Sequence, residues 1–255
     1  MTVDELAATL RQAHETGRPC PPLRSHLRDA SQAYAVQDTN TQHWLAKGRR
    51  LVGRKIGLTA KSVQKQLGVD EPDYGMLFAD MCCGDGEVVA RGAVMQPKVE
   101  GEVALILERD LGFEDATVAD IVRATAYCVP AIEIVGSRIE NWDIKLVDTI
   151  ADNASSGLFV LGSRPRLLRD VELRTCAMRM RKNADVVSEG TGEACMGNPL
   201  IAAVWLARTM AKVGRPLKAG DIVMTGALGP MAPVAAEDSV VVEIEGIGSV
   251  KVTFQ

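Results

Sequence analysis

The chain of 255 residues carries a formal net charge of −4, with 47% hydrophobic and 24% charged residues. This composition is ordinary for a globular protein with a buried core, and the length suits one large domain or a small domain attached to a larger one. Lysine and arginine are scattered, which argues against a nucleic-acid surface, and no apolar run approaches the roughly 20 residues of a membrane span.

The cysteines indicate the cellular compartment of the protein, and the positions of the histidines limit the kinds of active site that are possible. The six cysteines form no CxxC pair, which is typical of reduced thiols in a cytosolic protein. The N-terminal MTVDELAATLRQ is acidic and amphipathic, unlike a secretory signal, so we expect a cytoplasmic location. All three histidines, His14, His26 and His43, lie in the first fifth of the chain. A histidine-based active site further along the chain is therefore excluded.

The first fifty residues are expected to be mainly helical. Leu6, Leu10 and His14 mark one face of a first helix, which ends at TGRPCPP. A second helix is expected to begin near Asp29 or Ser31 and to run through QAYAVQDTNTQHWLAKGRR.

After these helices the pattern changes to short strands and turns. LVGRKIGLT predicts a strand interrupted by glycine, and TAKSVQKQLG predicts a helix capped by Thr59 and stopped by Gly68. Further strands are expected in GMLFADM, GDGEVV, EGEVALIL and YCVPAIEIVG. NPLIAAVWLARTMAKVG predicts a helix, with Asn198 as cap, Pro199 at its first position and Gly214 after its end. At the C-terminus, SVVVEIEGIGSVKVTF alternates around EGIG and predicts a hairpin.

The order of these elements predicts the fold class. The regular βαβ alternation of a doubly wound sheet is absent, so we expect an α+β architecture. Residues 1–70 are predicted to form a helical N-terminal region, and residues 71–255 a β-rich catalytic domain.

Three glutamates interrupt segments that are otherwise apolar enough to be buried. Glu100 and Glu102 lie two apart in QPKVEGEVALIL, so both side chains leave the same face of an extended strand. Glu133 is flanked by isoleucines in YCVPAIEIVGSR. A buried carboxylate must be protonated, paired or metal-bound. Two explanations are open: each glutamate has a nearby arginine, for which Arg138 is a candidate, or all three converge on a hard cation, Mg²⁺ or Mn²⁺.

Six blocks of sequence, in order, resemble the 2-hydroxypenta-2,4-dienoate hydratases (2-keto-4-pentenoate hydratases) of bacterial aromatic-ring degradation. The blocks are GRKIGLTAKSVQKQLGV, YGMLFADM, PKVEGEVAL, PAIEIVGSRI, DTIADNASSG and GDIVMTGALGPM. This family belongs to the fumarylacetoacetate hydrolase superfamily, close to the 4-oxalocrotonate decarboxylases. The resemblance implies a mixed β-roll body with a helical N-terminal part. It also places the family's metal ligands on Glu100, Glu102 and Glu133, which favours the metal over the arginine explanation.

The resemblance implies a lyase of the meta-cleavage pathway that hydrates 2-hydroxypenta-2,4-dienoate to 4-hydroxy-2-oxopentanoate, with Mg²⁺ or Mn²⁺ as cofactor. Such a hydration begins with ketonisation and protonation at C5. Water then adds at C4, and C3 is protonated last. These steps need the metal, an acid/base group and a cation near the developing oxyanion.

Four further residues are candidates for these tasks. Lys55, at the end of a short strand, matches the family's active-site lysine and is the predicted cation; otherwise it is a surface lysine. Asp80, in LFADM, follows an apolar run that could desolvate it and raise its pKa, so it is the acid/base candidate; otherwise it caps a turn. Ser155 in ADNASSG and Thr225 in MTGALGP are predicted to bind the substrate carboxylate, although a polar turn also explains the serine.

Other activities and a non-enzymatic role are the alternatives. 4-Oxalocrotonate decarboxylase uses similar metal ligands, and an acylpyruvate hydrolase of the superfamily cleaves a C–C bond. The lack of histidine after His43 counts against a histidine-activated water. An inactive partner subunit is disfavoured because the candidate residues are all present. The resemblance further implies a homo-oligomer, a pentamer or decamer, and a complex with 4-oxalocrotonate decarboxylase. The sequence does not predict the preferred dienoate, the physiological metal or the stereochemistry of hydration.

Overall fold

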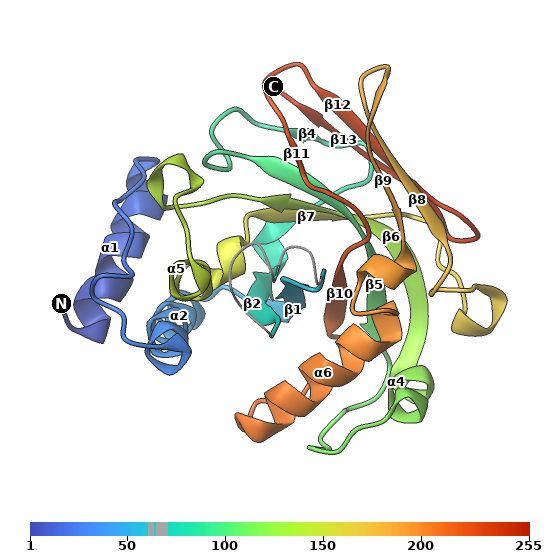
Figure 1. The fold of residues 1–255 in the computed structure, drawn as a ribbon, viewed down its shortest axis with the longest axis horizontal. Helices are drawn as coiled ribbons and strands as arrows, with labels where there is room; N and C mark the ends of the chain where they lie inside the picture. The colour runs from blue at the N-terminus through green and yellow to red at the C-terminus, as the bar shows by residue number, and fades with distance from the viewer. Residues whose placement is uncertain (61–63, 65–70) are drawn as a thin grey trace.

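The computed structural model describes residues 1–60, 64 and 71–255, and it consists of two curved sheets with helices at one end and along one side (Figure 1). The helix predicted from Thr59 to Gly68 lies largely outside the described residues. Within the described part of the chain, no helix combines the length and apolar character needed to cross a membrane.

Two helices account for most of the first fifty residues: α1 (Val3–Thr16) and α2 (Ala30–Ala46). Thr2 caps α1 and Asp29 caps α2, each through a side-chain oxygen that accepts a backbone N–H of the first turn. Both predicted helices are therefore confirmed. Their apolar faces pack with α5 (Leu146–Ala151) in a core of their own, which includes Leu6, Ala7, Leu10, Val36 and Ile150.

The larger sheet runs in the order β2-β1-β10-β5-β6-β7-β3, with β11 paired to β5. Its strands are β1 (Leu51–Gly57), β2 (Asp73–Phe78), β3 (Cys82–Cys83), β5 (Lys98–Leu107), β6 (Thr125–Val135), β7 (Leu158–Leu161), β10 (Ile222–Ala227) and β11 (Ala232–Pro233). β1 pairs with β10 in parallel, whereas β10, β5, β6 and β7 are antiparallel neighbours. The strand predicted in LVGRKIGLT is thus confirmed as β1, inside this sheet. The division of the chain at residue 70 stays a prediction.

The smaller sheet runs in the order β4-β13-β12-β8-β9. Its strands are β4 (Val88–Val89), β8 (Ala177–Lys182), β9 (Asp185–Thr191), β12 (Ser239–Ile244) and β13 (Gly248–Phe254). β12 and β13 form the predicted C-terminal hairpin.

Two further α-helices, α4 (Val118–Ala124) and α6 (Pro199–Lys212), cover the lower side of the sheets in Figure 1. Asn198 caps α6 as predicted, and Pro199 is its first residue. Short 3₁₀ turns complete the described elements, namely η1 (Ala79–Met81), η2 (Glu140–Trp142), η3 (Asn153–Ser155), η4 (Leu168–Asp170) and η5 (Gly192–Ala194). The helices and sheets together confirm an α+β fold.

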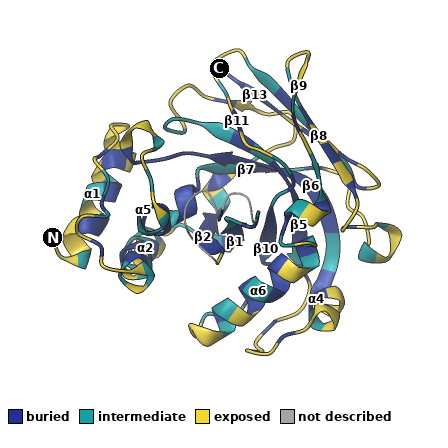
Figure 2. Ribbon diagram, in the orientation of Figure 1, coloured by how far each residue is buried: buried dark blue, intermediate teal, exposed yellow. Residues whose placement is uncertain are grey.

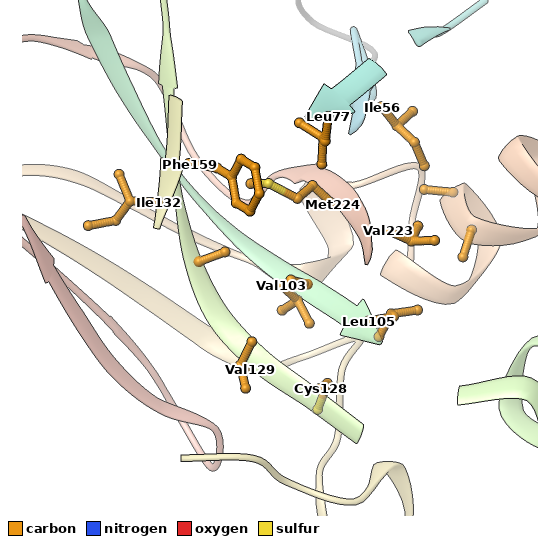
Figure 3. Packing of buried hydrophobic residues seen from close by; sticks show 14 of the residues in the cluster. Ile56, Leu77, Val103, Leu105, Cys128, Val129, Ile132, Phe159, Val223 and Met224 are labelled. Carbon is orange, nitrogen blue, oxygen red and sulfur yellow. The ribbon is translucent and has the colours of Figure 1, made fainter. Parts of the chain in front are cut away.

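The main core lies where the smaller sheet packs against β5 and β6, whose residues are largely buried in Figure 2. Figure 3 shows buried side chains of the large sheet in this core, including Val103 of β5 and Ile132 of β6. A Cβ atom at Gly101 would lie 3.0 Å from Met178 Sδ and 3.0 Å from Val242 Cγ1, so the missing side chain lets the smaller sheet approach β5 closely. Because side chains alternate along a strand, Glu100 and Glu102 leave the opposite face.

Asn153 joins the outer strand β2 to the turn that precedes β7. Its Oδ1 accepts the N–H of Met76 at 2.7 Å, and its Nδ2 donates to the carbonyl of Met76 at 2.9 Å. A side chain at Gly75 would clash with this turn, because its Cβ atom would lie 2.4 Å from the carbonyl oxygen of Asn153. The turn that carries Ser155 is therefore fixed against β2.

Asp148 anchors the segment between α1 and α2 to helix α5. Its side chain is fully buried, and its Oδ1 accepts the N–H groups of Leu23 and Arg24, both at 2.8 Å. Its Oδ2 accepts the Lys145 N–H at 2.9 Å and lies 3.1 Å from the Arg24 guanidinium. Helix α5 leads directly into the turn that carries Ser155, so this carboxylate supports the position of that turn.

We expect Asp148→Asn to lower the free energy of unfolding by about 3 kcal/mol, because it breaks a buried, hydrogen-bonded charge network. The matched control is Asp143→Asn. Asp143 pairs with the same Arg24, but its side chain is 57% exposed, and an exposed pair contributes less than about 1 kcal/mol. Urea denaturation of both variants tests the difference. Equal losses of stability would contradict the anchoring role of Asp148.

Candidate metal centre

Three glutamates lie together on the face of the large sheet that points away from the smaller sheet. The register of β5 and β6 sets Glu100 directly opposite Glu133, and Glu102 follows two residues later on the same face. One carboxylate oxygen from each residue lies within 4.8 Å of the others. Glu102 and Glu133 are buried, and Glu100 is partly buried. The strand pairing thus brings the three predicted ligands together, and their role in binding a metal stays a prediction.

The oxygen atoms of this cluster have few partners within the described part of the chain. Glu102 Oε2 accepts the Gly226 N–H at 2.9 Å. Glu102 Oε1 and Glu133 Oε2 are buried and have no hydrogen bond among the described residues, and Glu133 Oε1 has Lys55 as its partner. Buried, unpaired carboxylates are costly, and a set of oxygen donors with no histidine or cysteine suits a hard divalent cation. The residues present therefore fit Mg²⁺ or Mn²⁺.

Lys55 is a buried cation beside the cluster. Its Nζ lies 3.1 Å from Glu133 Oε1, and the two side chains are 4% and 1% exposed. Desolvation lowers the pKa of Lys55, but the surrounding carboxylates, Glu133 first among them, outweigh it and raise the pKa above its usual value. Lys55 is therefore charged at neutral pH. The alternative of a surface lysine is wrong.

Arg138 does not pair with the glutamates. It forms an ion pair with Asp152, and it donates hydrogen bonds to the backbone carbonyls of Asp152 and Ser156. The explanation that Arg138 neutralises the cluster is therefore wrong. Among the ion pairs of the described residues, only that of Lys55 reaches the three glutamates. One ammonium group leaves the cluster with an excess of negative charge.

This excess charge changes the protonation of the glutamates. Burial, followed by the charge of Glu133, raises the pKa of Glu100 to about 7. The same causes in the same order raise the pKa of Glu102 well above its usual value. Without a metal, the cluster therefore retains protons near neutral pH. A cation that binds must displace them.

A fourth carboxyl group, that of Asp73, lies beside Lys55 and was not among the predicted residues. Asp73 begins β2 directly opposite Gly57, the last residue of β1, and it is 1% exposed. A Cβ atom at Gly57 would lie 2.1 Å from Asp73 Oδ1 and 3.6 Å from Lys55 Nζ, so the glycine leaves room for both groups. Burial, opposed by the charge of Lys55, raises the pKa of Asp73 to about 6. Such a group can exchange a proton near neutral pH.

Asp80 lies in a different environment from the one expected. It belongs to η1, and its side chain is 58% exposed and forms an ion pair with Arg49 at 2.7 Å. The expectation that the preceding apolar run desolvates Asp80 is therefore wrong, because the chain turns outward after β2. The role of Asp80 in proton transfer stays a prediction.

Ser155 and Thr225 are both buried, and both hydroxyl groups already have partners. Ser155 Oγ lies 3.1 Å from Thr149 Oγ1. Thr225 Oγ1 donates to the carbonyl of Val103 at 2.8 Å. Thr225 lies near the cluster, since the next residue, Gly226, donates its N–H to Glu102. Their roles as ligands of the substrate carboxylate stay predictions.

Residues 36–255 match the family model for the fumarylacetoacetate (FAA) hydrolase C-terminal domain. The chain is also similar to 2-keto-4-pentenoate hydratase 1 of Dechloromonas aromatica, with 61% identity over 100% of this chain and 97% of the relative. The TodF product hydratase of Pseudomonas putida is 56% identical over 99% of this chain and 95% of the relative.

A solved structure with a similar fold is that of 4-oxalocrotonate decarboxylase from Pseudomonas putida G7, complexed with magnesium and adipate. The TM-score is 0.95, with 33% identity over 99% of this chain and 97% of that chain. A second structure of this decarboxylase, complexed with calcium and acetate, has a TM-score of 0.94. The architecture of the described residues is thus that of a decarboxylase whose two solved structures contain magnesium and calcium.

We expect Glu100→Gln to weaken Mg²⁺ binding by roughly 100-fold or more. Mutating a residue that only hydrogen-bonds a metal ligand typically lowers metal affinity by about 10–100-fold, and the loss of a ligand itself should lower it further. The melting temperature of the metal-free protein should stay equal or rise, since repulsion among the carboxylates is relieved. Glu189→Gln is the control: it removes an exposed carboxylate that pairs with Arg179 on the smaller sheet. Calorimetric titration with Mg²⁺ measures the affinity of the wild type, of Glu100→Gln and of Glu189→Gln. Unchanged affinity in Glu100→Gln would exclude this ligand.

The affinity for Mg²⁺ is expected to fall as the pH drops below about 7. The pKa of Glu100 is raised to about 7 in the metal-free protein, so below this pH a proton occupies a ligand that the cation needs. Above it Glu100 is ionised, and any further rise in affinity with pH reports loss of the proton on Glu102, whose pKa is also raised. For each displaced proton the affinity should change by about tenfold per pH unit. Titrations from pH 5.5 to pH 8.5 test this prediction, and an affinity independent of pH would contradict it.

Proposed function

The chain belongs to the fumarylacetoacetate hydrolase family, and we propose that it adds water to 2-hydroxypenta-2,4-dienoate to give 4-hydroxy-2-oxopentanoate. One observation carries the proposal: the three-glutamate cluster and its buried lysine lie in a chain that is 61% identical to a 2-keto-4-pentenoate hydratase along its whole length. The enzyme would thus be a hydro-lyase.

Glu100, Glu102 and Glu133 are the proposed ligands of Mg²⁺ or Mn²⁺. When bound, such a cation supplies positive charge that stabilises an oxyanion at the C2 oxygen of the substrate. Glu102 Oε1 and Glu133 Oε2, which have no partner among the described residues, support this assignment. Ser155 and Thr225 are the proposed contacts of the substrate carboxylate. Thr225 lies in β10, the neighbour of β5, and Ser155 lies in the turn before β7, the neighbour of β6.

Lys55 is proposed to provide a second, fixed positive charge. Its ammonium group is buried, so its field acts in a medium of low dielectric constant and is weakly screened. As the C2 hydroxyl loses its proton, this charge favours the oxyanion over the neutral enol. The raised pKa of Lys55 means that it keeps its own proton throughout the reaction.

Asp73 is proposed to move the protons. Its carboxyl group lies next to Lys55 at the end of β1, and its pKa of about 6 suits a group that accepts and returns a proton. In the overall reaction the C2 hydroxyl loses a proton, C5 gains one, the attacking water loses one and C3 gains one. A single carboxyl group satisfies this balance if it accepts the proton of the C2 hydroxyl and gives it to C5, and then accepts a proton from water and gives it to C3. Asp80 is the alternative carrier.

The decarboxylase is the second candidate function, because the fold matches 4-oxalocrotonate decarboxylase with a TM-score of 0.95. The test is to follow the ultraviolet absorbance of 2-hydroxypenta-2,4-dienoate with Mg²⁺, and again with EDTA. We expect loss of the dienoate only with the divalent cation. Release of CO₂ from 4-oxalocrotonate without hydration of the dienoate would reverse the assignment. Cleavage of an acylpyruvate would instead indicate a hydrolase.

We also propose that the protein is a cytoplasmic homo-oligomer, a pentamer or decamer, that can associate with a 4-oxalocrotonate decarboxylase. The proposal rests on the similarity to the 2-keto-4-pentenoate hydratases. Light scattering measures the mass, and a monomer in solution would contradict the oligomer.

Two matched substitutions distinguish the candidate proton carriers. We expect Asp73→Asn to lower kcat by roughly 10²–10⁴-fold, the usual contribution of general acid–base catalysis, while binding of Mg²⁺ and of the unreactive chelator oxalate survives. Asp80→Asn removes the same charge from an exposed ion pair, and kcat should then stay within about threefold of the wild type. Steady-state kinetics with melting temperatures as a folding control provide the comparison. A large loss of kcat in Asp80→Asn with normal kcat in Asp73→Asn would reverse the roles.

A further inference from the structure

Thr149, in helix α5, interacts with two residues that the proposed hydration uses. Its hydroxyl group is hydrogen-bonded to Ser155, the proposed contact of the substrate carboxylate, and it also reaches Asp73, the proposed proton carrier. All three residues are buried: Asp73 is 1% exposed, Thr149 5% and Ser155 4%. The hydration as proposed gives tasks to Asp73 and Ser155 but none to the residue that joins them.

A strained turn brings Ser155 to Thr149. Ser155 Oγ lies 3.1 Å from Thr149 Oγ1, and either hydroxyl group can be the donor. The backbone is left-handed at three consecutive residues, Asn153, Ala154 and Ser155, with φ of +55°, +52° and +54°. This conformation is unfavourable for residues with a Cβ atom, and it persists only where the surrounding structure enforces it. The fold thus accepts backbone strain at the point where the two hydroxyl groups meet.

The carboxyl group of Asp73 lacks donors. Neither of its oxygens has a hydrogen bond of ordinary geometry among the described residues. The Thr149 hydroxyl is close enough to lower the pKa of Asp73 through hydrogen bonding, although burial dominates and raises it. Because a buried carboxylate without donors is unfavourable, Thr149 is a donor that Asp73 needs when it is ionised.

Gln37 holds the backbones that carry Asp73 and Thr149 close together. Its side chain extends from α2, and the residue is 2% exposed. Its Nε2 donates to the carbonyl of Tyr74 at 2.9 Å and to the carbonyl of Ile150 at 3.0 Å. Tyr74 directly follows Asp73, and Ile150 directly follows Thr149. One buried amide group therefore fixes the start of β2 against α5.

A threonine hydroxyl has a single hydrogen, which limits this chain to two arrangements. When Asp73 is ionised, Thr149 donates to the carboxylate, and its hydrogen bond to Ser155 requires Ser155 to donate. The hydrogen of Ser155 is then not available to the substrate. When Asp73 holds a proton, Thr149 can donate to Ser155 instead, and the Ser155 hydrogen is free for the substrate carboxylate.

We propose that Thr149 is a positioning residue: it lets Ser155 donate to the substrate carboxylate only while Asp73 carries the proton taken from the substrate. This inference rests on the proposed function. The hydrogen bond from Ser155 would form after the first proton transfer, so it would favour the later, rate-determining states over the bound substrate. Such an interaction raises kcat rather than lowering KM.

Thr149→Val removes the hydroxyl group and keeps the shape of the side chain. We expect kcat for 2-hydroxypenta-2,4-dienoate with Mg²⁺ to fall roughly 10–100-fold, the usual effect of losing a hydrogen bond to a charged group. KM should stay equal or fall, because Ser155 is then free to bind the substrate from the start. Thr149→Ser keeps a hydroxyl group, and its kcat should lie within about threefold of the wild type.

Thr125→Val is the matched control. Thr125 is also buried, and its Oγ1 donates to the carbonyl of Ile121 at 2.8 Å, at the start of β6 and away from this chain. Both kcat and KM should stay unchanged in this variant. Melting temperatures and calorimetric titration with Mg²⁺ establish that the fold and the metal centre of each variant are intact.

The kinetics separate the possible outcomes. Equal losses of kcat in Thr149→Ser and Thr149→Val, or a Thr149→Val variant that raises KM at normal kcat, would overturn the inference. If Thr149→Val does not fold, Ser155→Ala decides: a lower kcat at unchanged KM supports the chain, and a higher KM alone contradicts it. A wild type that does not hydrate the dienoate would contradict the proposed function and this inference with it. An active wild type with unaffected Thr149→Val would contradict the inference alone.

Discussion

Four buried or partly buried carboxyl groups share one buried ammonium group at the centre of the large sheet. Glu100, Glu102, Glu133 and Asp73 surround Lys55 with too much negative charge for a medium of low dielectric constant. Such an arrangement persists only if protons or a cation compensate the charge. The raised pKa values of Glu100, Glu102 and Asp73 show the first solution, and a divalent cation is the second. Because a cation must replace these protons, metal binding depends on pH. The same carboxyl groups can then carry protons.

The fold supports this concentration of charge from both sides. Behind β5, Gly101 lets the smaller sheet pack directly on the strand, so the backbone that carries Glu100 and Glu102 is held rigidly. Beside β5, the pairing with β10 is irregular between Met224 and Ala227, and there Gly226 turns its N–H toward Glu102. Gly226 has a φ of +108°, which few other residues adopt, and a Cβ atom would lie 2.4 Å from Thr59 Oγ1. The fold thus places the backbone of Glu100 and Glu102, and one carboxylate oxygen of Glu102, without any ligand.

The sequence predicted what depends on short-range patterns. The two-residue spacing of Glu100 and Glu102, the caps of the helices and the C-terminal hairpin are local signals, and the structure agrees with them. The environments of Asp73 and Asp80 depend instead on which strands become neighbours. Asp73 is buried because β2 pairs with β1, and Asp80 is exposed because the chain leaves the sheet directly after β2. Arg138 likewise binds Asp152, 14 residues away, rather than the glutamate five residues before it. The sequence did contain one signal for Asp73. It stands directly before the apolar residues YGMLF, where a charged residue is unexpected.

The most direct test of the metal centre is anomalous X-ray diffraction from crystals of the full chain soaked in Mn²⁺. The arrangement of the carboxylates predicts one strong manganese peak at about 2.0–2.2 Å from an oxygen atom of each of Glu100, Glu102 and Glu133, with its remaining ligands supplied by water. A soaked crystal with no peak between these three residues, while Lys55 remains their sole neutralising partner, would contradict the account.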